Sequence, residues 1–354
     1  MRRGNLVFEL IFDDSLHYSQ KTVIAYAMNF WQQIKKPIKL LAPMAGYTDS
    51  VFRSICKDFG ADAVMTELIS ADAIYFALKK SKEKLLKSKT YSLMQFQESE
   101  RPVVIQLFGK DPEKFIVAAG FIETELKADG IDLNLGCSVK KVLKSGHGAA
   151  LLNDIDQAVL IIKSLKESTK LSISVKTRTG FSDQSEILKF GPELAAAGAD
   201  AIIVHGRTAK QGFAGEADWT NIYKLKEMLP DTIIIGNGDI KKYDDIIKRV
   251  KNLDGVAIGR AALGRPWIFS GKEPKSSELV KLIRKQARLA YKMKGKQGII
   301  ELRKHLVWYF KGFENALELR KASIMIESLE DVERILHFTS GVGSDSSEAG
   351  MVQN

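Results

Sequence analysis

Short apolar runs alternate with helical stretches from Ile38 onward. Eight of these runs are bounded by turn residues and predict strands over 38–44, 63–69, 102–108, 130–136, 171–177, 201–206, 232–237 and 255–259. Apolar residues at helical spacing lie between them and predict helices over 49–59, 112–127, 156–168, 186–197 and 243–251. This alternation is typical of consecutive βα units that build a parallel sheet.

Eight consecutive units predict an α/β fold of the (β/α)8, or TIM-barrel, type, because an open doubly wound sheet would use about five to seven strands. After the barrel, R-P-W-I-F at 265–269 predicts a short closing helix, and 271–277 predicts a linker. The predicted domains are an extension over 1–36 with a helix at 22–33 and no assignable role, a barrel over 37–271, a small helical domain over 277–338, and a Ser- and Gly-rich tail over 339–354 that is expected to be disordered.

The predicted strand over 130–136 has two different faces. Side chains alternate along a strand, so the apolar positions 131, 133 and 135 share one face, while Asp132 and Asn134 share the other. Cys137 follows where the chain leaves the sheet. A polar row opposite an apolar row indicates that one face packs under helices and the other looks into a site. The alternative is that Cys137 is a small packing residue, as free cysteine often is.

The active sites of (β/α)8 barrels lie at the C-terminal ends of the strands. The residues expected there, most of them polar, are Met44, Ala45, Glu67, Gln106, Asn134, Cys137, Lys176, Arg178, His205, Arg207, Asn237, Gly238, Gly259 and Arg260. The glycines and the arginine after the last two strands suit a phosphate site, because glycine permits close backbone approach and arginine pairs with phosphate. Taken singly, Lys176 could be a solvated charge and His205 a satisfied core histidine.

Charge is distributed unevenly along the chain. The formal net charge is +10, and between Lys281 and Lys311 there are ten Lys or Arg residues against the single acid Glu301. On the first predicted C-terminal helix the basic residues recur at helical spacing: Lys281, Arg284, Lys285, Arg288 and Lys292. A second helix shows Lys304, Trp308 and Lys311 beside an apolar face. This pattern favours a polyanionic partner, and a solvated basic surface is the alternative. For the six lysines between 79 and 89 we expect a solvated helix.

Several other classes of site are disfavoured. The two cysteines, Cys56 and Cys137, cannot form a disulfide framework, and Cys56 is predicted to lie in the core. The histidines show no metal-ligand spacing, so we predict no metal site. G-H-G-A-A-L at 146–151 lacks the third glycine of a dinucleotide fingerprint. No apolar run approaches the length of a membrane span, and acidic residues interrupt the N-terminal apolar stretch, so a cytoplasmic protein is expected.

An ordered set of motifs resembles the tRNA-dihydrouridine synthase family. The motifs are L-A-P-M-A-G-Y-T-D (41–49), D-L-N-L-G-C (132–137), K-V-x-K-x-G-x-G-A-A-L-L (141–152), V-K-T-R-x-G (175–180), H-G-R-T (205–208), G-N-G-D-I (236–240) and G-R-A-A-x-G-R-P-W-I-F (259–269). The resemblance covers residues from about 39 to 337. In the C-terminal helices, R-K-H-x-x-W-Y-x-K-G (303–312) resembles a bacterial branch known as the B type.

The resemblance implies an enzyme that binds FMN and reduces particular uridines of tRNA, with NADPH as the electron source. A hydride must reach carbon 6 of uracil while a proton reaches carbon 5, and Cys137 would be the general acid, present as a thiol before transfer. Gln106 would meet the pyrimidine edge of the flavin, Lys176 its carbonyl side, and His205 the ring or phosphate. The remaining cofactor contacts implied are Pro43, Met44, Ala45, Asn237, Gly238, Gly259 and Arg260.

The substrate contacts implied or suggested are Asn134 with the uracil ring, and Arg178, Arg207, Lys285, Arg288, Lys292, Lys304 and Trp308 with the RNA. One departure from the family pattern is Ser138, where a proline usually follows the cysteine. Loss of the proline could loosen the loop that aims the thiol. Two alternatives remain open: a flavin barrel acting on a free pyrimidine, as in dihydroorotate dehydrogenases, and a catalytically weak tRNA-binding chaperone.

Overall fold

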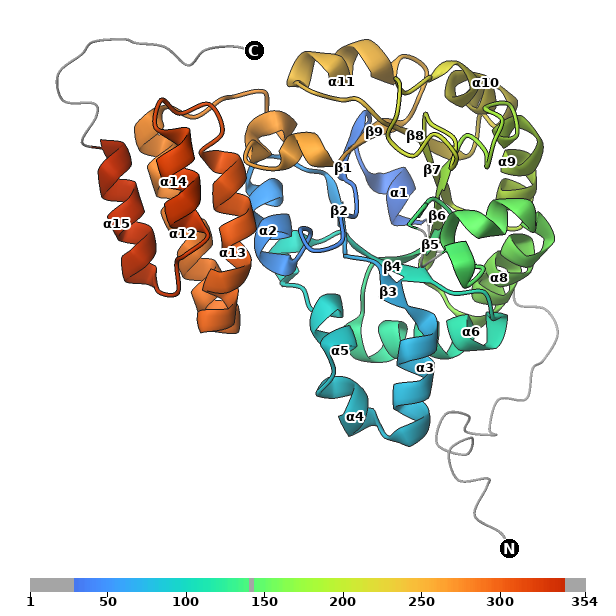
Figure 1. Ribbon diagram of the computed structural model, residues 1–354. Helices are drawn as coiled ribbons and strands as arrows, with labels where there is room; N and C mark the ends of the chain where they lie inside the picture. Colours follow the sequence, from blue (N-terminus) through green and yellow to red (C-terminus); the bar gives the residue numbers. More distant parts are fainter. Residues whose placement is uncertain (1–28, 140–142, 341–354) are drawn as a thin grey trace, which may run out of the picture.

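The computed structural model describes residues 29–139 and 143–340 and confirms the predicted barrel (Figure 1). Its strands are β1 (Ile38–Leu41), β2 (Ala63–Met65), β4 (Val103–Phe108), β5 (Gly130–Asn134), β6 (Ser172–Arg178), β7 (Ala201–His205), β8 (Ile233–Asn237) and β9 (Gly255–Ile258). Every pairing is parallel, β1 lies between β2 and β9, and the pairing of β2 with β4 closes the ring. The short strand β3 (Ile69–Ser70), which was not predicted separately, extends the sheet beside the end of β4.

The helices that follow the strands are α2 (Ser50–Asp58), α3 (Ala71–Lys80), α4 (Lys82–Leu86), α5 (Lys89–Met94), α6 (Pro112–Phe121), α8 (Ile155–Ser168), α9 (Ile187–Ala196), α10 (Thr220–Met228) and α11 (Tyr243–Val250). The helix predicted over 112–127 instead divides at Phe121, where the π-helix η2 (Ile122–Leu126) begins. The π-helix ends at Lys127, which has a φ of 52° and donates its N–H to the Ile122 carbonyl at 2.8 Å.

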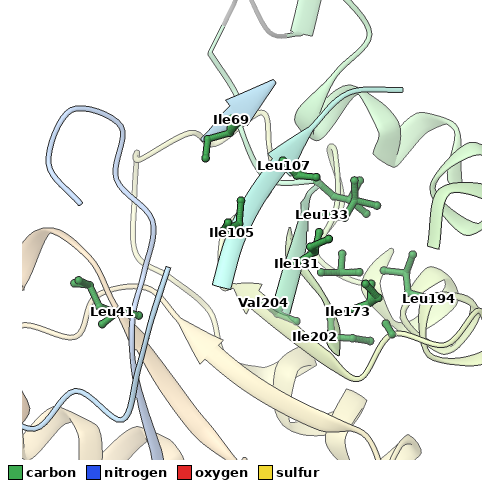
Figure 2. Packing of buried hydrophobic residues seen from close by; sticks show 14 of the residues in the cluster. Leu41, Ile69, Ile105, Leu107, Ile131, Leu133, Ile173, Leu194, Ile202 and Val204 are labelled. Atoms are coloured by element: carbon green, nitrogen blue, oxygen red, sulfur yellow. The ribbon is translucent and has the colours of Figure 1, made fainter. Parts of the chain in front are cut away.

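Alternation along the strands separates two apolar regions. Outward side chains such as Ile131 and Leu133 pack against the surrounding helices (Figure 2). Inward side chains such as Leu40, Met65 and Ile203 form a separate cluster inside the barrel. Polar residues take inward positions on β5 and β6 instead, as the pattern over 130–136 predicted for β5, and on β4 Gln106 is polar while Val104 belongs to the interior cluster. The barrel interior therefore has an apolar side and a polar side.

A short N-terminal helix belongs to the barrel. Helix α1 (Phe30–Gln33) is capped by the side chain of Asn29, and the Trp31 side chain is fully buried against the interior cluster that contains Ile38. Phe30 lies beside β5 and β6, since a Cβ added to Gly130 would meet its ring at 3.0 Å. Part of the segment that the sequence left without a role therefore packs on the barrel. The rest of the predicted helix over 22–33 lies outside the described residues.

Four helices follow the barrel: α12 (Ser276–Lys294), α13 (Lys296–Tyr309), α14 (Ala316–Ser323) and α15 (Leu329–Ser340). They pack side by side beyond α2 (Figure 1) and share their own apolar cluster, which also includes Ile55 and Trp267 from the barrel. None of the helices in the described ranges is long and apolar enough to cross a membrane. The predicted tail lies outside the described residues from 341 onward.

Contacts between the four helices and the barrel are close. Lys294 donates to Asp49 and Glu301, and Lys285 pairs with Asp58 at 2.7 Å. Gly264 has a φ of 69°, and a Cβ there would lie 2.4 Å from the backbone of Trp308. Only glycine fits this position, because a side chain would meet backbone rather than a movable group. This approach brings α13 to the mouth of the barrel.

Candidate active site

A cleft of about 550 Å³ opens at the C-terminal ends of the barrel strands and is bordered by α13. It brings together most of the residues predicted from the sequence: Pro43, Met44, Ala45, Gln106, Asn134, Cys137, Lys176, Arg178, His205, Asn237, Gly238, Gly259, Arg260 and Trp308. These residues come from segments that are up to 265 positions apart in the chain (43 to 308). Barrel closure therefore assembles the site.

The innermost part of the site is a chain of hydrogen bonds around Asp132. Gln106 Nε2 donates to Asp132 Oδ2 at 2.8 Å, and Ser174 Oγ donates to Asp132 Oδ1 at 2.7 Å. Asn134 Nδ2 donates to Gln106 Oε1 at 2.9 Å. Burial raises the pKa of Asp132 to about 6, although these hydrogen bonds and the charge of Lys176 favour the ionised form.

Lys176 extends inward from β6 toward β8. Its Nζ donates to Asn237 Oδ1 at 3.1 Å, and Asn237 Nδ2 donates to the Ala257 carbonyl at 2.7 Å. Burial and the nearby charge of Arg178 lower the pKa of Lys176 to about 8. The amine is therefore still mainly protonated at neutral pH, and it is held in place rather than freely solvated.

His205 stands at the end of β7 with 9% of its surface exposed. Its buried Nδ1 has no hydrogen-bond partner among the described residues. Burial, together with the positive charges of Lys176 and Arg178, lowers the pKa of His205 far below its ordinary value. The ring is therefore neutral at physiological pH. His205 lines the cleft, so its unpaired nitrogen is placed where a bound group could contact it.

The segment that carries Cys137 is held at four backbone atoms. Asn134 Oδ1 accepts from the N–H groups of Gly136 at 3.1 Å and Cys137 at 2.9 Å. Arg178 Nε donates to the Gly136 carbonyl at 2.8 Å, and the Ala149 N–H donates to the Cys137 carbonyl at 3.0 Å. These bonds order the start of the loop although Ser138 replaces the usual proline. Residues 140–142 lie outside the described residues.

Two predicted substrate contacts, Arg178 and Arg207, hold loops through hydrogen bonds. Arg178 lines the cleft, but its Nη1 donates to the carbonyls of Thr208 and Gly212, both at 2.9 Å. Arg207 is 3% exposed and does not line the cleft. It donates to the carbonyls of Ala214 and Gly215 and to the Asp239 carboxylate. Arg207 therefore holds the loop after β7, because that loop folds back over its guanidinium.

That loop also brings Phe213, which the sequence reasoning missed, to the mouth of the cleft. Its side chain is 61% exposed, and its ring centroid lies 4.4 Å from the guanidinium carbon of Arg260 and 5.8 Å from that of Arg178. The only sequence feature that could have suggested it is a lone aromatic residue between Gly212 and Gly215. An exposed ring over two arginines offers a stacking surface.

The loop after β8 is shaped by glycine. Gly238 has a φ of 120°, and a Cβ there would lie 2.7 Å from the Ala217 Cβ. A Cβ added to Gly259 would face the cleft, with Met44 Sδ at 3.7 Å as its nearest neighbour. The Gly259 backbone can therefore approach a bound group closely, as the phosphate-site prediction requires, whereas glycine at 238 is required by the positive φ and the contact with Ala217. Within residues 29–139 and 143–340 no group of three or more potential ligands is arranged around a metal position.

Comparison with known proteins assigns the chain that forms this cleft to a family. The profile described as "Dihydrouridine synthase (Dus)" matches residues 40–340. The chain is 36% identical over 321 residues to a probable tRNA-dihydrouridine synthase of Aquifex aeolicus, with 87% of this chain and 96% of that protein covered. The chain belongs to the tRNA-dihydrouridine synthase family. Members of this family are oxidoreductases, which confirms the enzyme class expected from the motifs.

Further comparisons agree with this assignment. A probable tRNA-dihydrouridine synthase of Rickettsia conorii is 33% identical over 322 residues, with 86% of this chain and 93% of that protein covered. Among solved structures, a complex of 2-naphthoyl-CoA reductase matches with a TM-score of 0.51 at 12% identity, covering 66% of this chain and 49% of that one. This structural similarity at 12% identity supports the barrel fold alone. The B-type branch stays a prediction.

Family membership argues against the free-pyrimidine alternative, and it leaves the chaperone alternative to be tested by turnover. The structure separates the basic residues of the C-terminal helices into groups. Lys285 pairs with Asp58, and Arg284 pairs with Glu333. Arg288 and Lys292 are exposed on α12. The Lys304 ammonium lies 5.7 Å from the Tyr47 ring centroid, and that of Lys311 lies 5.9 Å from the Trp308 ring centroid.

Proposed function

We propose that the cleft binds FMN and reduces particular uridines of tRNA to 5,6-dihydrouridine, with Cys137 as the proton donor and NADPH as the electron source. The observation that carries this proposal is the meeting of Cys137 with Gln106, Lys176 and the glycine loops in one cleft. A thiol at the rim and cationic and amide groups at the floor match the two transfers that the reaction needs.

The residues present fit FMN. His205 lines the cleft with an unpaired Nδ1, a buried polar atom that a bound flavin could pair. Gly238 and Gly259 line the cleft, and the open backbone at Gly259 with the exposed Arg260 beside it suits a terminal phosphate. Pro43, Met44 and Ala45 border the same cleft and offer a wall for a flat ring. Asn237 completes the floor.

When bound, FMN would supply the hydride, and NADPH would then reduce the flavin again. Lys176 would keep a positive charge at the floor, and the neutral His205 would donate or accept a hydrogen bond without adding charge. Cys137 would deliver its proton to carbon 5 of the uracil ring from the rim. Asn134 uses one amide hydrogen in the Gln106 contact, so its second amide hydrogen would remain for the uracil ring.

Capture of tRNA would involve the four C-terminal helices. A uridine within folded RNA must be unstacked before it can enter the cleft, which costs a few kcal/mol, on the order of 2 to 4. Trp308 borders the cleft with Lys311 beside its ring, and Lys304 lies on the same helix. These groups would contact the backbone and bases next to the target uridine. Arg288 and Lys292 would extend that surface along α12.

Separate measurement of the two half-reactions tests this function. Purified protein should be yellow, and NADPH should bleach the oxidised-flavin absorbance. Cys137→Ala should leave the bleaching nearly unchanged and slow tRNA reduction by about 10²-fold or more, the usual scale for loss of a general acid. Cys56→Ala is the matched control, because Cys56 is fully buried in the core, and it should affect neither step specifically. A colourless protein that takes up no FMN would contradict the proposal, and so would an equal loss of both half-reactions in Cys137→Ala.

A further inference from the structure

We propose that Asp132 is a positioning residue that sets the direction of a hydrogen-bond chain running through Gln106 and Asn134 to the backbone of Cys137. This deepens the proposed function and rests on it for the catalytic consequence. The chain itself stands on four contacts, with lengths between 2.8 and 3.1 Å, that join the inner wall of the barrel to the segment carrying the thiol.

The direction of the chain follows from the chemistry of its inner end. An ionised carboxylate only accepts hydrogen bonds, so Gln106 must turn its NH2 group toward Asp132. Its carbonyl then faces Asn134, which must answer with its own NH2 group. The Asn134 carbonyl is left for the loop. A single acceptor at one end therefore fixes the orientation of two amide side chains that could otherwise flip.

The outer end of the chain is where direction matters for Cys137. The N–H groups of Gly136 and Cys137 both point at Asn134 Oδ1. If Asn134 flipped, its NH2 group would face two N–H donors, and both backbone bonds would be lost. Four of the side chains on this wall are buried to 8% exposure or less: Gln106, Asp132, Asn134 and Ser174. Water therefore cannot easily replace a lost partner.

The charged groups that face Asp132 favour its ionised form. Lys176, on the neighbouring strand β6, is the charged side chain that acts on its pKa, and Arg178 lies beyond it on the same strand. With a pKa of about 6, the carboxyl is ionised above neutral pH, so the acceptor-only end is present under working conditions. The other carboxylate oxygen is held by Ser174, which lies outside the path to Cys137.

Reversal of the chain by exchange of the carboxylate and the amide is the decisive test. In Asn134→Asp, two carboxylates flank Gln106, whose single NH2 group can face only one of them. In the double variant Asp132→Asn with Asn134→Asp, every partner is matched again. The carboxylate now at position 134 would accept from Gln106 and from both backbone N–H groups, and the new amide at position 132 would donate to the Gln106 carbonyl. Asp132→Asn alone can present either its oxygen or its NH2 group to Gln106, so the inner end no longer fixes the direction, and its amides should exchange at a rate between those of the wild type and Asn134→Asp.

The readout is hydrogen exchange of the Gly136 and Cys137 amides in the full chain at pH 8. In Asn134→Asp the carboxylate can still accept from both amides, but it loses its bond to Gln106 and is repelled by the Gln106 carbonyl. We therefore expect these amides to exchange about tenfold faster, and the double variant to return to within about threefold of wild type. Ser174→Ala is the control and should exchange like the wild type at these amides. If Asn134→Asp does not fold, recovery of cooperative unfolding in the double variant is the same rescue.

Failure of the double variant to restore slow exchange or folding would overturn the proposal, as would wild-type exchange in Asn134→Asp. A second arm measures tRNA reduction and flavin bleaching in the same variants. Because the amide of Asn134 is also proposed to contact uracil, the rescue is scored on hydrogen exchange and not on tRNA reduction. If Asn134 acted only by contacting uracil, a change at Asp132 would not rescue it. If the protein bound no FMN, the proposed function would fail, and the exchange arm would still decide whether Asp132 positions the loop.

Discussion

At the scale of single residues, the buried carboxyl of Asp132 has an energetic consequence that can be measured. Its pKa of about 6 in the folded chain exceeds the ordinary 3.8, so the folded state binds the proton more tightly than the unfolded chain does. The contribution of Asp132 to the free energy of unfolding is therefore most favourable at low pH and is lost as the pH rises through 6. A residue that lowers stability at neutral pH is expected to be kept for the arrangement of its neighbours.

Asp132→Asn removes this titration and gives a pH-dependent prediction. The difference in unfolding free energy between the variant and the wild type should shift in favour of the variant by about 1 to 2 kcal/mol between pH 5 and pH 8. Urea unfolding at the two pH values measures it. The comparison between pH values cancels the pH-independent effect of any hydrogen bond that the variant does not make. An equal difference at both values would mean that Asp132 titrates normally in the folded chain.

Residue positions on the strands could be predicted from alternation, but side-chain partners could not. The inward direction of Asp132, Asn134 and Lys176 follows from the two-residue period of a strand. The hydrogen-bond partners of Arg207 do not follow from this period. Its guanidinium is surrounded by carbonyls of a loop whose path depends on Gly212 and Gly215. Phe213 was missed for the same reason.

At the scale of elements, the packing of α13 against the barrel depends on Gly264. A methyl group there would meet the Trp308 backbone at 2.4 Å, whereas Gly295 has a similar positive φ with open space around it. Gly264→Ala should therefore reduce the free energy of unfolding by about 1 to 3 kcal/mol more than Gly295→Ala, which carries only the conformational cost. Denaturant unfolding of both variants measures the difference. Equal effects would contradict close packing at this position.

Element positions were predicted well where apolar patterns are strong. All of the predicted strand starts lie within one residue of the structure, and β4, β6 and β8 each begin one residue later than predicted. The π-helix after Phe121 and the short strand β3 were missed, because a local widening of a helix and a two-residue pairing leave no periodic pattern. The lysine-rich segment forms α4 and flanking helix ends, with Lys82 and Lys87 paired to glutamates.

At the scale of the whole molecule, the order of eight βα units was enough to predict the barrel, since closure follows from strand number and parallel pairing. The way in which the helical domain docks was beyond the sequence. It depends on contacts such as Lys285 with Asp58 and Lys294 with Asp49. Lys285 is exposed although it pairs with Asp58, so its predicted contact with RNA stays a prediction.

The exposed residues Arg288 and Lys292 also carry the RNA prediction. Their joint change to Ala should weaken tRNA binding and flatten its dependence on log salt by up to about one unit for each phosphate that is no longer neutralised. The control is Lys80→Ala with Lys84→Ala, which removes the same charge from exposed positions near α4. Titrations at several salt concentrations separate the two. Equal effects of the two pairs would mean that only net charge matters.

The most direct measurement of the central claim is a map of dihydrouridine in tRNA from cells that lack this protein. We predict that particular positions lose the modification, and that wild-type protein restores it while Cys137→Ala does not. Purified wild-type protein with NADPH should also form dihydrouridine at the same positions in that tRNA. An unchanged map in the absence of the protein, or full restoration by Cys137→Ala, would contradict the assignment of uridine reduction to this cleft.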